Sequence, residues 1–132
     1  MNINSLRLGN YIFVGRTMFE KPRRILGFDR QHVLIEHENK KEHEFGVFRS
    51  ELISGIPLNI KILIQSGFSR DSISSQDFSL DHIRVRIFDG GGFFISFDTL
   101  DREIKEIKYL HELQNFFFET RNKELQINFN KK

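Results

Sequence analysis

The chain has 132 residues, 39% hydrophobic and 29% charged, which is enough for one compact domain or two very small ones. It contains no cysteine, which excludes disulfides, thiolate zinc ligands and thiol catalysis. The net charge of +2 is too small to indicate a polyanionic partner, although the first 30 residues hold six basic residues against two acidic ones. No apolar stretch approaches the about 18 residues of a membrane span. The first residues also lack a signal-peptide pattern, so we expect a cytoplasmic protein.

Four short β-strands are expected in the first part of the chain, because β-branched and aromatic residues alternate there with polar turns. These strands are Leu8–Val14, Arg24–Phe28, His32–Glu38 and Phe45–Phe48. Several short strands joined by polar turns are typical of an antiparallel meander or a small barrel. We therefore expect an SH3-like β-meander or small barrel over residues 1–56.

A short helix is expected at the start of the remaining part, residues 57–132. Asn59 can cap this helix, and Gly67 can end it in the left-handed conformation. The polar stretch 69–79 then predicts a loop or a weak edge strand. Because each part alone is too small to sustain a core easily, we expect residues 1–56 and 57–132 to fold as one cooperative unit.

A β-hairpin is the clearest element pair of the sequence. Apolar and polar side chains alternate over Ile83–Ile87 and again from Phe93, and the glycines between the two runs can supply the positive φ angles of a tight turn. On its polar face, Asp98 is expected to pair with Arg84 and Arg86. After the hairpin, the sequence predicts a long helix to about residue 121 and a short final strand over residues 125–129.

The long C-terminal helix has two distinct faces at 3.6 residues per turn. A broad apolar stripe suits a core: Tyr109, Leu110, Leu113, Phe116 and Phe117. A second stripe has the i, i+3, i+4, i+7 spacing of neighbours on one face: His111, Gln114, Asn115 and Phe118. A catalytic role of His111 is disfavoured, because no nucleophile or carboxylate stands at a suggestive spacing, and the stripe has two other interpretations. It can pack on a sheet edge or another segment, with its amides satisfying backbone groups, or it can bind a partner.

No catalytic residue, cofactor or metal site is predicted. The serines lie in no nucleophile elbow, and no pair of carboxylates stands among apolar neighbours. The glycines at 90–92 lack the lysine and hydroxyl of a phosphate-binding loop. His37 and His43 flank an acidic turn but lack the spacing of a zinc motif. The sequence therefore predicts a protein that is not an enzyme and needs no cofactor.

Two segments resemble a group of small uncharacterised proteins of gut anaerobes of the Bacteroides type, their phages and their mobile elements. The segments are Asn4–Tyr11 (NSLRLGNY) and Ile107–Phe118 (IKYLHELQNFFF), and the link Ile56-Pro57-Leu58 is also similar. The chain departs from the group in its many phenylalanines near the end and in Asn122-Lys123, where a Thr-Gly pair is expected. The resemblance implies a cytoplasmic protein of phage or mobile-element context, and it transfers no functional residue.

Two functions follow as expectations. The first is a non-enzymatic interaction or accessory protein that binds a protein partner or a copy of itself. The alternative is nucleic-acid binding by basic residues of the N-terminal meander, which SH3-like folds often perform. The residues in question are Arg16, Lys21, Arg23 and Arg24.

Overall fold

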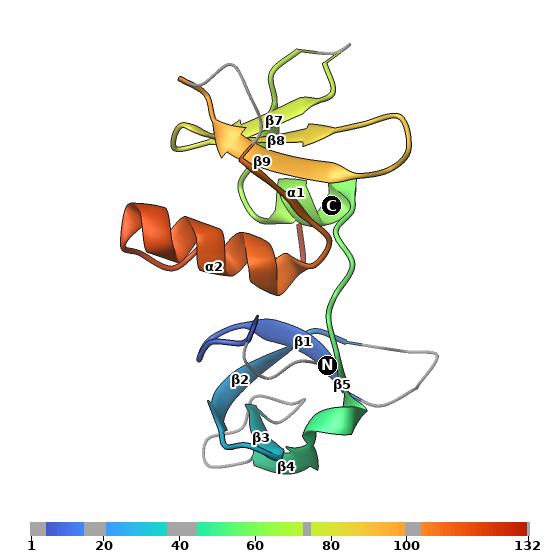
Figure 1. Cartoon of the computed structure of the whole chain (residues 1–132), viewed down its shortest axis with the longest axis vertical. Helices are drawn as coiled ribbons and strands as arrows, with labels where there is room; N and C mark the ends of the chain where they lie inside the picture. The colour runs from blue at the N-terminus through green and yellow to red at the C-terminus, as the bar shows by residue number, and fades with distance from the viewer. Residues whose placement is uncertain (1–4, 15–20, 37–44, 73–74, 100–103, 132) are drawn as a thin grey trace. The chain divides into compact units, whose positions relative to one another are not determined.

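The computed structural model describes residues 5–14, 21–36, 45–72, 75–99 and 104–131 (Figure 1). These residues form an α+β fold with two five-stranded antiparallel sheets and two α-helices. The chain divides into two compact units, called here the N-terminal and the C-terminal unit. The N-terminal unit is Met1–Ile56 with Tyr109–Asn115, and the C-terminal unit is Pro57–Lys108 with Phe116–Lys132.

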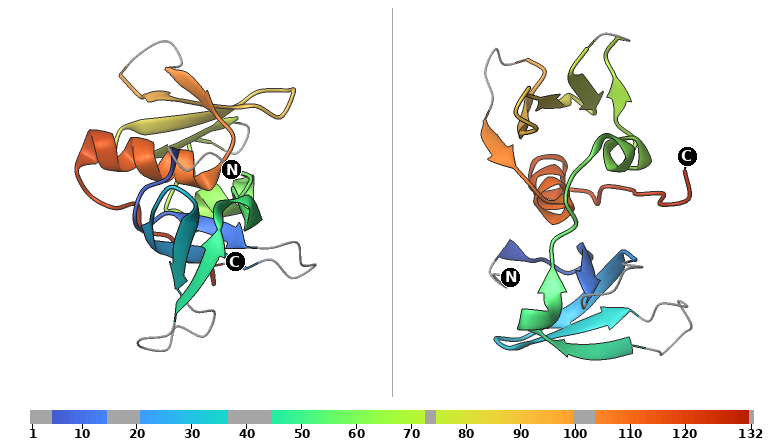
Figure 2. Two further views of the ribbon diagram at one scale, coloured as in Figure 1. Left: turned by 60° about the horizontal axis from the view of Figure 1, so that its bottom comes forward. Right: turned by 90° about the vertical axis from the view of Figure 1, so that its right-hand side faces the viewer.

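The N-terminal unit contains the first sheet, with the strand order β4-β3-β2-β1-β5. Its strands are β1 (Tyr11–Val14), β2 (Arg23–Phe28), β3 (His32–Glu36), β4 (Phe45–Arg49) and β5 (Ile53–Ser54). A 3-10 turn over Ser50–Leu52 leads from β4 to β5, and Figure 2 shows the strands curving. Among the described residues no pairing joins β4 to β5, so the expected meander is present without closure into a barrel.

The core of this unit lies on one face of the curved sheet, because alternate residues of a strand point to the same side. It consists of Leu6, Ile12, Ile25, Val33, Ile35 and Ile53, with Val14 and Phe48 packed against them. The ladder between β2 and β3 shifts between Ile25 and Gly27. Residues 26 and 27 therefore oppose Leu34 together, as in a β-bulge. This bulge places Leu26 next to Gly27 on the face away from the core.

The C-terminal unit contains the second sheet, with the strand order β10-β9-β8-β7-β6. Its strands are β6 (Ser69–Arg70), β7 (Asp77–Leu80), β8 (Ile83–Ile87), β9 (Phe93–Phe97) and β10 (Lys105–Ile107). The predicted hairpin is confirmed: β8 pairs with β9 from Ile83 opposite Phe97 to Ile87 opposite Phe93. Gly91 adopts φ +86° in the turn.

Two helices complete the fold. The predicted short helix is α1 (Ile60–Gln65), and the side chain of Asn59 caps it by accepting a hydrogen bond from the Ile62 N–H at 2.8 Å. Gly67 follows it with φ +91°. The long helix is α2 (Leu110–Arg121); its residues to Asn115 belong to the N-terminal unit and the others to the C-terminal unit.

Two expectations about strands need correction. The polar stretch 69–79, expected to be a loop or a weak edge strand, does contain the short edge strand β6, but it also contributes to β7, which pairs with β8 despite its polar residues. The expected final strand over residues 125–129 is absent, since the described residues 122–131 form no ladder. Instead the Gln65 amide nitrogen donates to the carbonyls of Phe129 (3.0 Å) and Lys131 (3.2 Å), and the Gln65 carbonyl accepts from the Asn128 N–H at 2.8 Å. Gln65 of α1 thus forms hydrogen bonds to backbone groups that a neighbouring strand would otherwise bond.

Candidate interaction sites

The polar stripe of α2 is largely buried. His111 and Gln114 are 2% and 1% exposed, and Asn115 is half-buried. These three residues belong to the N-terminal unit. Phe118 belongs to the C-terminal unit and is also half-buried.

Gln114 pairs with the backbone at the start of β1. Its side-chain oxygen accepts from the Tyr11 N–H at 2.9 Å, and its side-chain nitrogen donates to the Gly9 carbonyl at 3.2 Å. These two backbone groups belong to the residues on either side of Asn10. A residue of a parallel neighbouring strand placed beside Asn10 would bond to the same two groups. The amide of Gln114 therefore completes the edge of β1, and both buried polar groups are satisfied.

Asn115 holds the turn that precedes β1. Its nitrogen donates to the Ser5 carbonyl at 2.9 Å, while its oxygen accepts from Asn10 Nδ2 at 2.9 Å and from Arg7 Nε at 3.3 Å. The fully buried Asn10 closes the turn by accepting from the Arg7 N–H at 2.6 Å. Gly9 allows the turn because its φ is +88°, which other residues rarely adopt. Segments more than 100 residues apart in sequence are thus joined by neutral hydrogen bonds.

The segments that meet in this cluster, within residues 5–11 and 111–115, lie in the two stretches on which the expected resemblance rests. The chain's own backbone therefore uses the amides of Gln114 and Asn115, which is the packing interpretation of the polar stripe. Partner binding by these two amides would require their present bonds to break. The packing interpretation thus rests on the two amides and not on His111, which is buried, or on Phe118, which is half-buried.

His111 is buried beside Ser5 and Tyr109. Its Nε2 lies 3.4 Å from the Ser5 hydroxyl, and its ring stacks on the Tyr109 ring with centroids 5.7 Å apart. Burial lowers the pKa of His111 below its ordinary value, and the nearby Glu112 opposes this shift only in part. Nδ1 has no hydrogen-bond partner among the described residues. Among the described residues, the Ser5–His111 contact therefore stands without the third group that orients the imidazole of a catalytic Ser–His pair.

Among the described basic residues of the meander, Arg23 and Arg24 lie on opposite faces of the sheet. Arg16 lies outside the described residues, and Lys21 is exposed. Arg23 donates to the Glu36 carbonyl at 3.3 Å, and its guanidinium lies 5.7 Å from the centre of the Phe48 ring. Arg24 is exposed and lies opposite Tyr11 in the ladder. Because Arg23 and Arg24 are consecutive strand residues, their side chains point to opposite faces.

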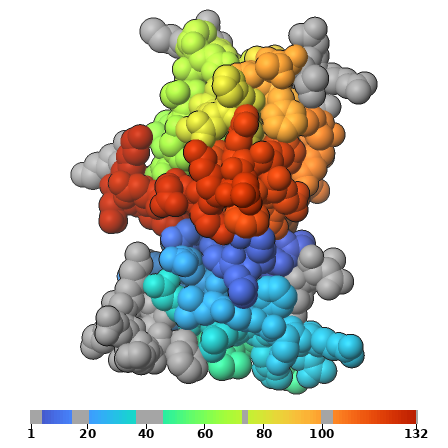
Figure 3. Space-filling model, turned by 90° about the vertical axis from the view of Figure 1, so that its left-hand side faces the viewer, coloured from blue at the N-terminus to red at the C-terminus, as the bar shows by residue number. Residues whose placement is uncertain are grey.

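An apolar patch, which the sequence reasoning missed, lies on the outer face of the first sheet. It consists of Leu26, Leu34 and Val47 and is called here the outer apolar patch. Leu34 and Val47 are direct ladder partners, and Leu26 joins them through the bulge. Val47 is 61% exposed and Leu26 43% exposed. The blue and light-blue residues of this unit, which include β1 and β2, form a continuous part of the surface seen in Figure 3.

The sequence did contain a signal for this patch. A half-exposed antiparallel sheet normally alternates apolar and polar residues, whereas Ile25-Leu26, Val33-Leu34-Ile35 and Val47-Phe48 are unbroken apolar runs. One side chain of each run must face away from the core. Such runs in a meander therefore indicate a second apolar face.

On the outer face of the second sheet, Asp77 pairs with Arg86 through two bonds of 2.7 and 3.0 Å. The Arg86 hydrogen bond is the main cause that lowers the pKa of Asp77. The expected partner of the arginines was the Asp98 carboxylate, but this group lies 3.0 Å from His82 Nδ1, and Arg84 donates to the Asp98 backbone carbonyl instead, at 3.4 Å. The prediction was wrong because β7, which brings Asp77 opposite Arg86, was interpreted as part of a loop or weak strand.

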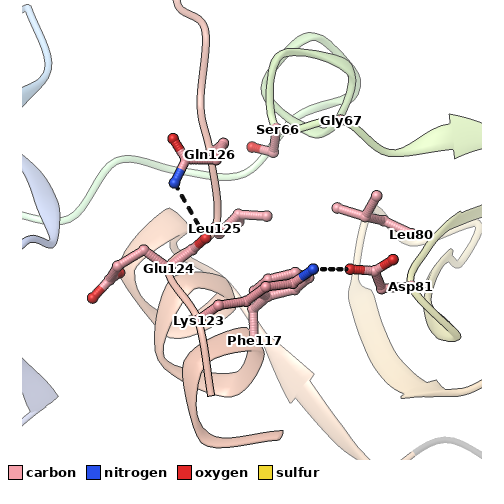
Figure 4. Close-up of a pocket in the computed structure, with 9 residues that line it drawn as sticks. All are labelled: Ser66, Gly67, Leu80, Asp81, Phe117, Lys123, Glu124, Leu125 and Gln126. Atoms are coloured by element: carbon pink, nitrogen blue, oxygen red, sulfur yellow. Dashed lines mark hydrogen bonds and ion pairs between the residues drawn. The ribbon is translucent and has the colours of Figure 1, made fainter. Parts of the chain in front are cut away.

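A cavity of about 340 Å³ lies in the C-terminal unit (Figure 4). Leu80, Phe117 and Leu125 supply its apolar surface. Lys123 extends along the Phe117 ring and forms an ion pair of 2.9 Å with Asp81. This lysine therefore already has an acidic partner, and Ser66, Glu124 and Gln126 supply further polar groups of the lining.

The fold and these contacts define an α+β protein with two antiparallel sheets. No family model matches the chain, and comparisons with curated proteins and with solved structures also gave no match. In the described part of the chain, no three His, Asp or Glu side chains are grouped so that they could hold a metal ion. The helices described there are too short or too polar to cross a membrane.

Proposed function

We propose that this protein is a non-enzymatic interaction protein that binds a protein partner through the outer apolar patch. The observation that carries the proposal is the exposure of Leu26 and Val47, at 43% and 61%, beside Leu34 on one face. Apolar patches with a polar border are typical of protein-binding surfaces. Tyr11 and Arg24 lie on the same face, and their residue types are enriched at the energetic centres of interfaces.

Two further points support an interaction protein in general and do not concern the outer apolar patch. The strand order and the 3-10 turn between β4 and β5 favour an SH3-like meander, a scaffold that carries many unrelated functions. The resemblance of residues 4–11 and 107–118 favours an accessory role in a phage or mobile element. The partner is therefore proposed to be a protein that the same phage, element or host cell makes.

A matched pair of variants tests the proposal. Leu26→Asp places a charge in the outer apolar patch, whereas Ile60→Asp does the same at a similarly exposed site of α1 (43% and 41% exposed). Tagged full-length proteins would be isolated from cells that contain the native partner, and the bound proteins identified by mass spectrometry. We expect the partner to be lost with Leu26→Asp and retained with Ile60→Asp, while thermal melts show both variants folded. Equal recovery with both variants would contradict the proposal.

Nucleic-acid binding is the second candidate, favoured by the exposure of Lys21 and Arg24 and by the basic excess of the first 30 residues. Phosphate contacts would give an affinity that falls steeply with salt. Fluorescence anisotropy with mixed DNA and RNA at low and moderate salt would show such binding, and Arg24→Ala should weaken it. Flat titrations at micromolar protein would remove this candidate.

A further inference from the structure

The two sheets have four edge strands, and three of these are protected against pairing with another chain. β5 and β6 have only two residues each, and β10 has three, of which Lys105 and Glu106 are charged. Short strands and charged side chains are common means of protecting a sheet edge. The fourth edge, β4, has neither form of protection at its centre.

β4 is a regular strand of five residues, Phe-Gly-Val-Phe-Arg, without proline or lysine. It pairs with β3 at every position from His32–Arg49 to Glu36–Phe45 without a bulge. Val47, at its centre, has the highest exposed fraction of the large hydrophobic residues that the structure describes, 61%. An edge with these properties is a template for another strand.

The ladder also determines which backbone groups point outward. The Ser50 N–H donates to the Gln31 carbonyl at 2.9 Å, which continues the β3–β4 ladder as a hydrogen-bonded pair. Since such pairs alternate in antiparallel sheets, residues 48 and 46 bond to β3, and the N–H and C=O of Val47 and Arg49 point away from it. Figure 2 shows β4 at the end of the sheet, and no described strand pairs with its outer side.

We propose that β4 pairs antiparallel with β4 of a second copy of this chain, about a twofold axis at Val47. The strand is self-complementary in this register. Val47 meets Val47 of the second copy, and Gly46 lies opposite Phe48. Arg49 is the strand's one charged residue. It lies opposite Phe45 of the second copy, so the two Arg49 residues are not paired with each other. A contact in which both copies use the same residues closes as a dimer.

Two strands of this length form a small contact, so the dimer should be weak and depend on concentration. The pairing uses backbone groups at the sheet edge, whereas the proposed function uses side chains of the outer face. The two proposals share Val47, but Leu26 belongs to the proposed function alone. Variants at these two positions therefore separate the failure of one proposal from that of the other.

Sedimentation velocity of the full chain over a concentration series tests the dimer. The weight-average mass of the native protein should rise toward twice that of one chain. Val47→Pro removes one outward N–H and leaves the bonds of residues 46 and 48 to β3, as proline is tolerated on the outer side of an edge strand. This variant should remain a monomer at all concentrations. The matched control Leu26→Lys should dimerise like the native protein.

If a thermal melt shows that Val47→Pro is unfolded, Val47→Lys replaces it, because the two added charges would face each other across the axis. Hydrogen exchange gives a second readout: the amides of Val47 and Arg49 should become protected as the concentration of native protein rises. A native protein that stays monomeric, a Val47 variant that dimerises normally, or an equal loss of dimer in Leu26→Lys would each overturn the proposal.

Discussion

Both units use a buried amide to bond distant backbone groups, Gln114 in the N-terminal unit and Gln65 in the C-terminal unit, but the C-terminal unit also holds ion pairs near its surface. In the N-terminal unit, neutral amides of Gln114, Asn115 and Asn10 are used within a largely buried cluster, and they join segments that are distant in sequence. In the C-terminal unit, Asp77–Arg86 and Lys123–Asp81 are ion pairs nearer the surface. Buried neutral bonds depend on exact geometry and little on salt, whereas exposed ion pairs are screened. The cluster of Gln114, Asn115 and Asn10 should therefore be sensitive to single substitutions, and the ion pairs of the C-terminal unit should be sensitive to salt.

The largest expected effect comes from removing residues 1–56. The remaining fragment keeps residues 109–115, but Gln114 and Asn115 lose their partners in the N-terminal segment. Leu110 and Leu113, which are fully buried in the whole chain, lose their surroundings in that unit. We expect fragment 57–132 to lack a sharp thermal transition in circular dichroism, since its core is small. A sharp transition like that of the whole chain would show that the C-terminal unit folds independently.

Phe117→Ala tests the core of the C-terminal unit. Phe117 is 3% exposed, so its truncation should cost about 3–5 kcal/mol of unfolding free energy through lost burial and a cavity. The neighbouring Phe118→Ala should cost less, because Phe118 is half-buried. Urea denaturation of both variants gives the comparison. An equal loss for Phe118→Ala would make Phe118 a core residue and exclude it from any interaction surface.

Gln114→Ala tests the N-terminal unit. It leaves the Tyr11 N–H and the Gly9 carbonyl without their partner, which should cost about 2–4 kcal/mol in total. Gln114→Glu keeps the shape but places an acceptor against the Gly9 carbonyl, so it should also destabilise the protein strongly. Both losses should be nearly the same in urea melts at low and high salt. A near-native midpoint for Gln114→Ala would mean that water replaces the amide at no cost.

The elements that the sequence predicted correctly have local signals. Asn59 and Gly67 mark the ends of α1, and the glycines near Gly91 mark the β8–β9 turn. β7 was not recognised as a full strand because Asp77 and Ser79 are polar and its stability comes from pairing with β8. The prediction of a final strand was wrong because Gln65, about 60 residues earlier, forms hydrogen bonds with the backbone of that segment.

The candidate sites also depend on contacts between residues that are distant in sequence. The helical spacing placed Gln114 and Asn115 correctly on one face, but their partners at Gly9, Tyr11 and Ser5 cannot be found from spacing, since the fold alone brings them together. The outer apolar patch differs, because the unbroken apolar runs of β2 to β4 indicate it in the sequence itself. Polar contacts between residues that are distant in sequence can thus be identified only in the structure, whereas an excess of apolar residues in a strand can be recognised in the sequence.

His111 gives the N-terminal unit a pH dependence. Its pKa in the folded protein lies below the ordinary 6.5 because it is buried, so the unfolded chain binds a proton more readily. Stability is then fully present above pH 6.5 and falls as the pH decreases below it, by at most about 1.4 kcal/mol per pH unit. Urea melts from pH 8 to about pH 5 would measure this slope. His111→Gln should reduce it, and Glu112→Gln, which keeps the imidazole, should not.

The smallest expected effect is that of Asp77→Asn in the C-terminal unit. The Arg86 side chain that pairs with Asp77 is 40% exposed, and partly exposed ion pairs contribute about 0.2–1 kcal/mol. Because Arg86 lowers the pKa of Asp77 from 3.8, this contribution is present above that pH and is lost in stronger acid. The difference between native protein and variant should therefore shrink at high salt and at low pH. Urea melts of Asp77→Asn and Gln114→Ala under the same conditions compare the two units directly. A loss for Asp77→Asn as large and as independent of salt as that for Gln114→Ala would show that the Asp77–Arg86 pair also depends on buried polar geometry.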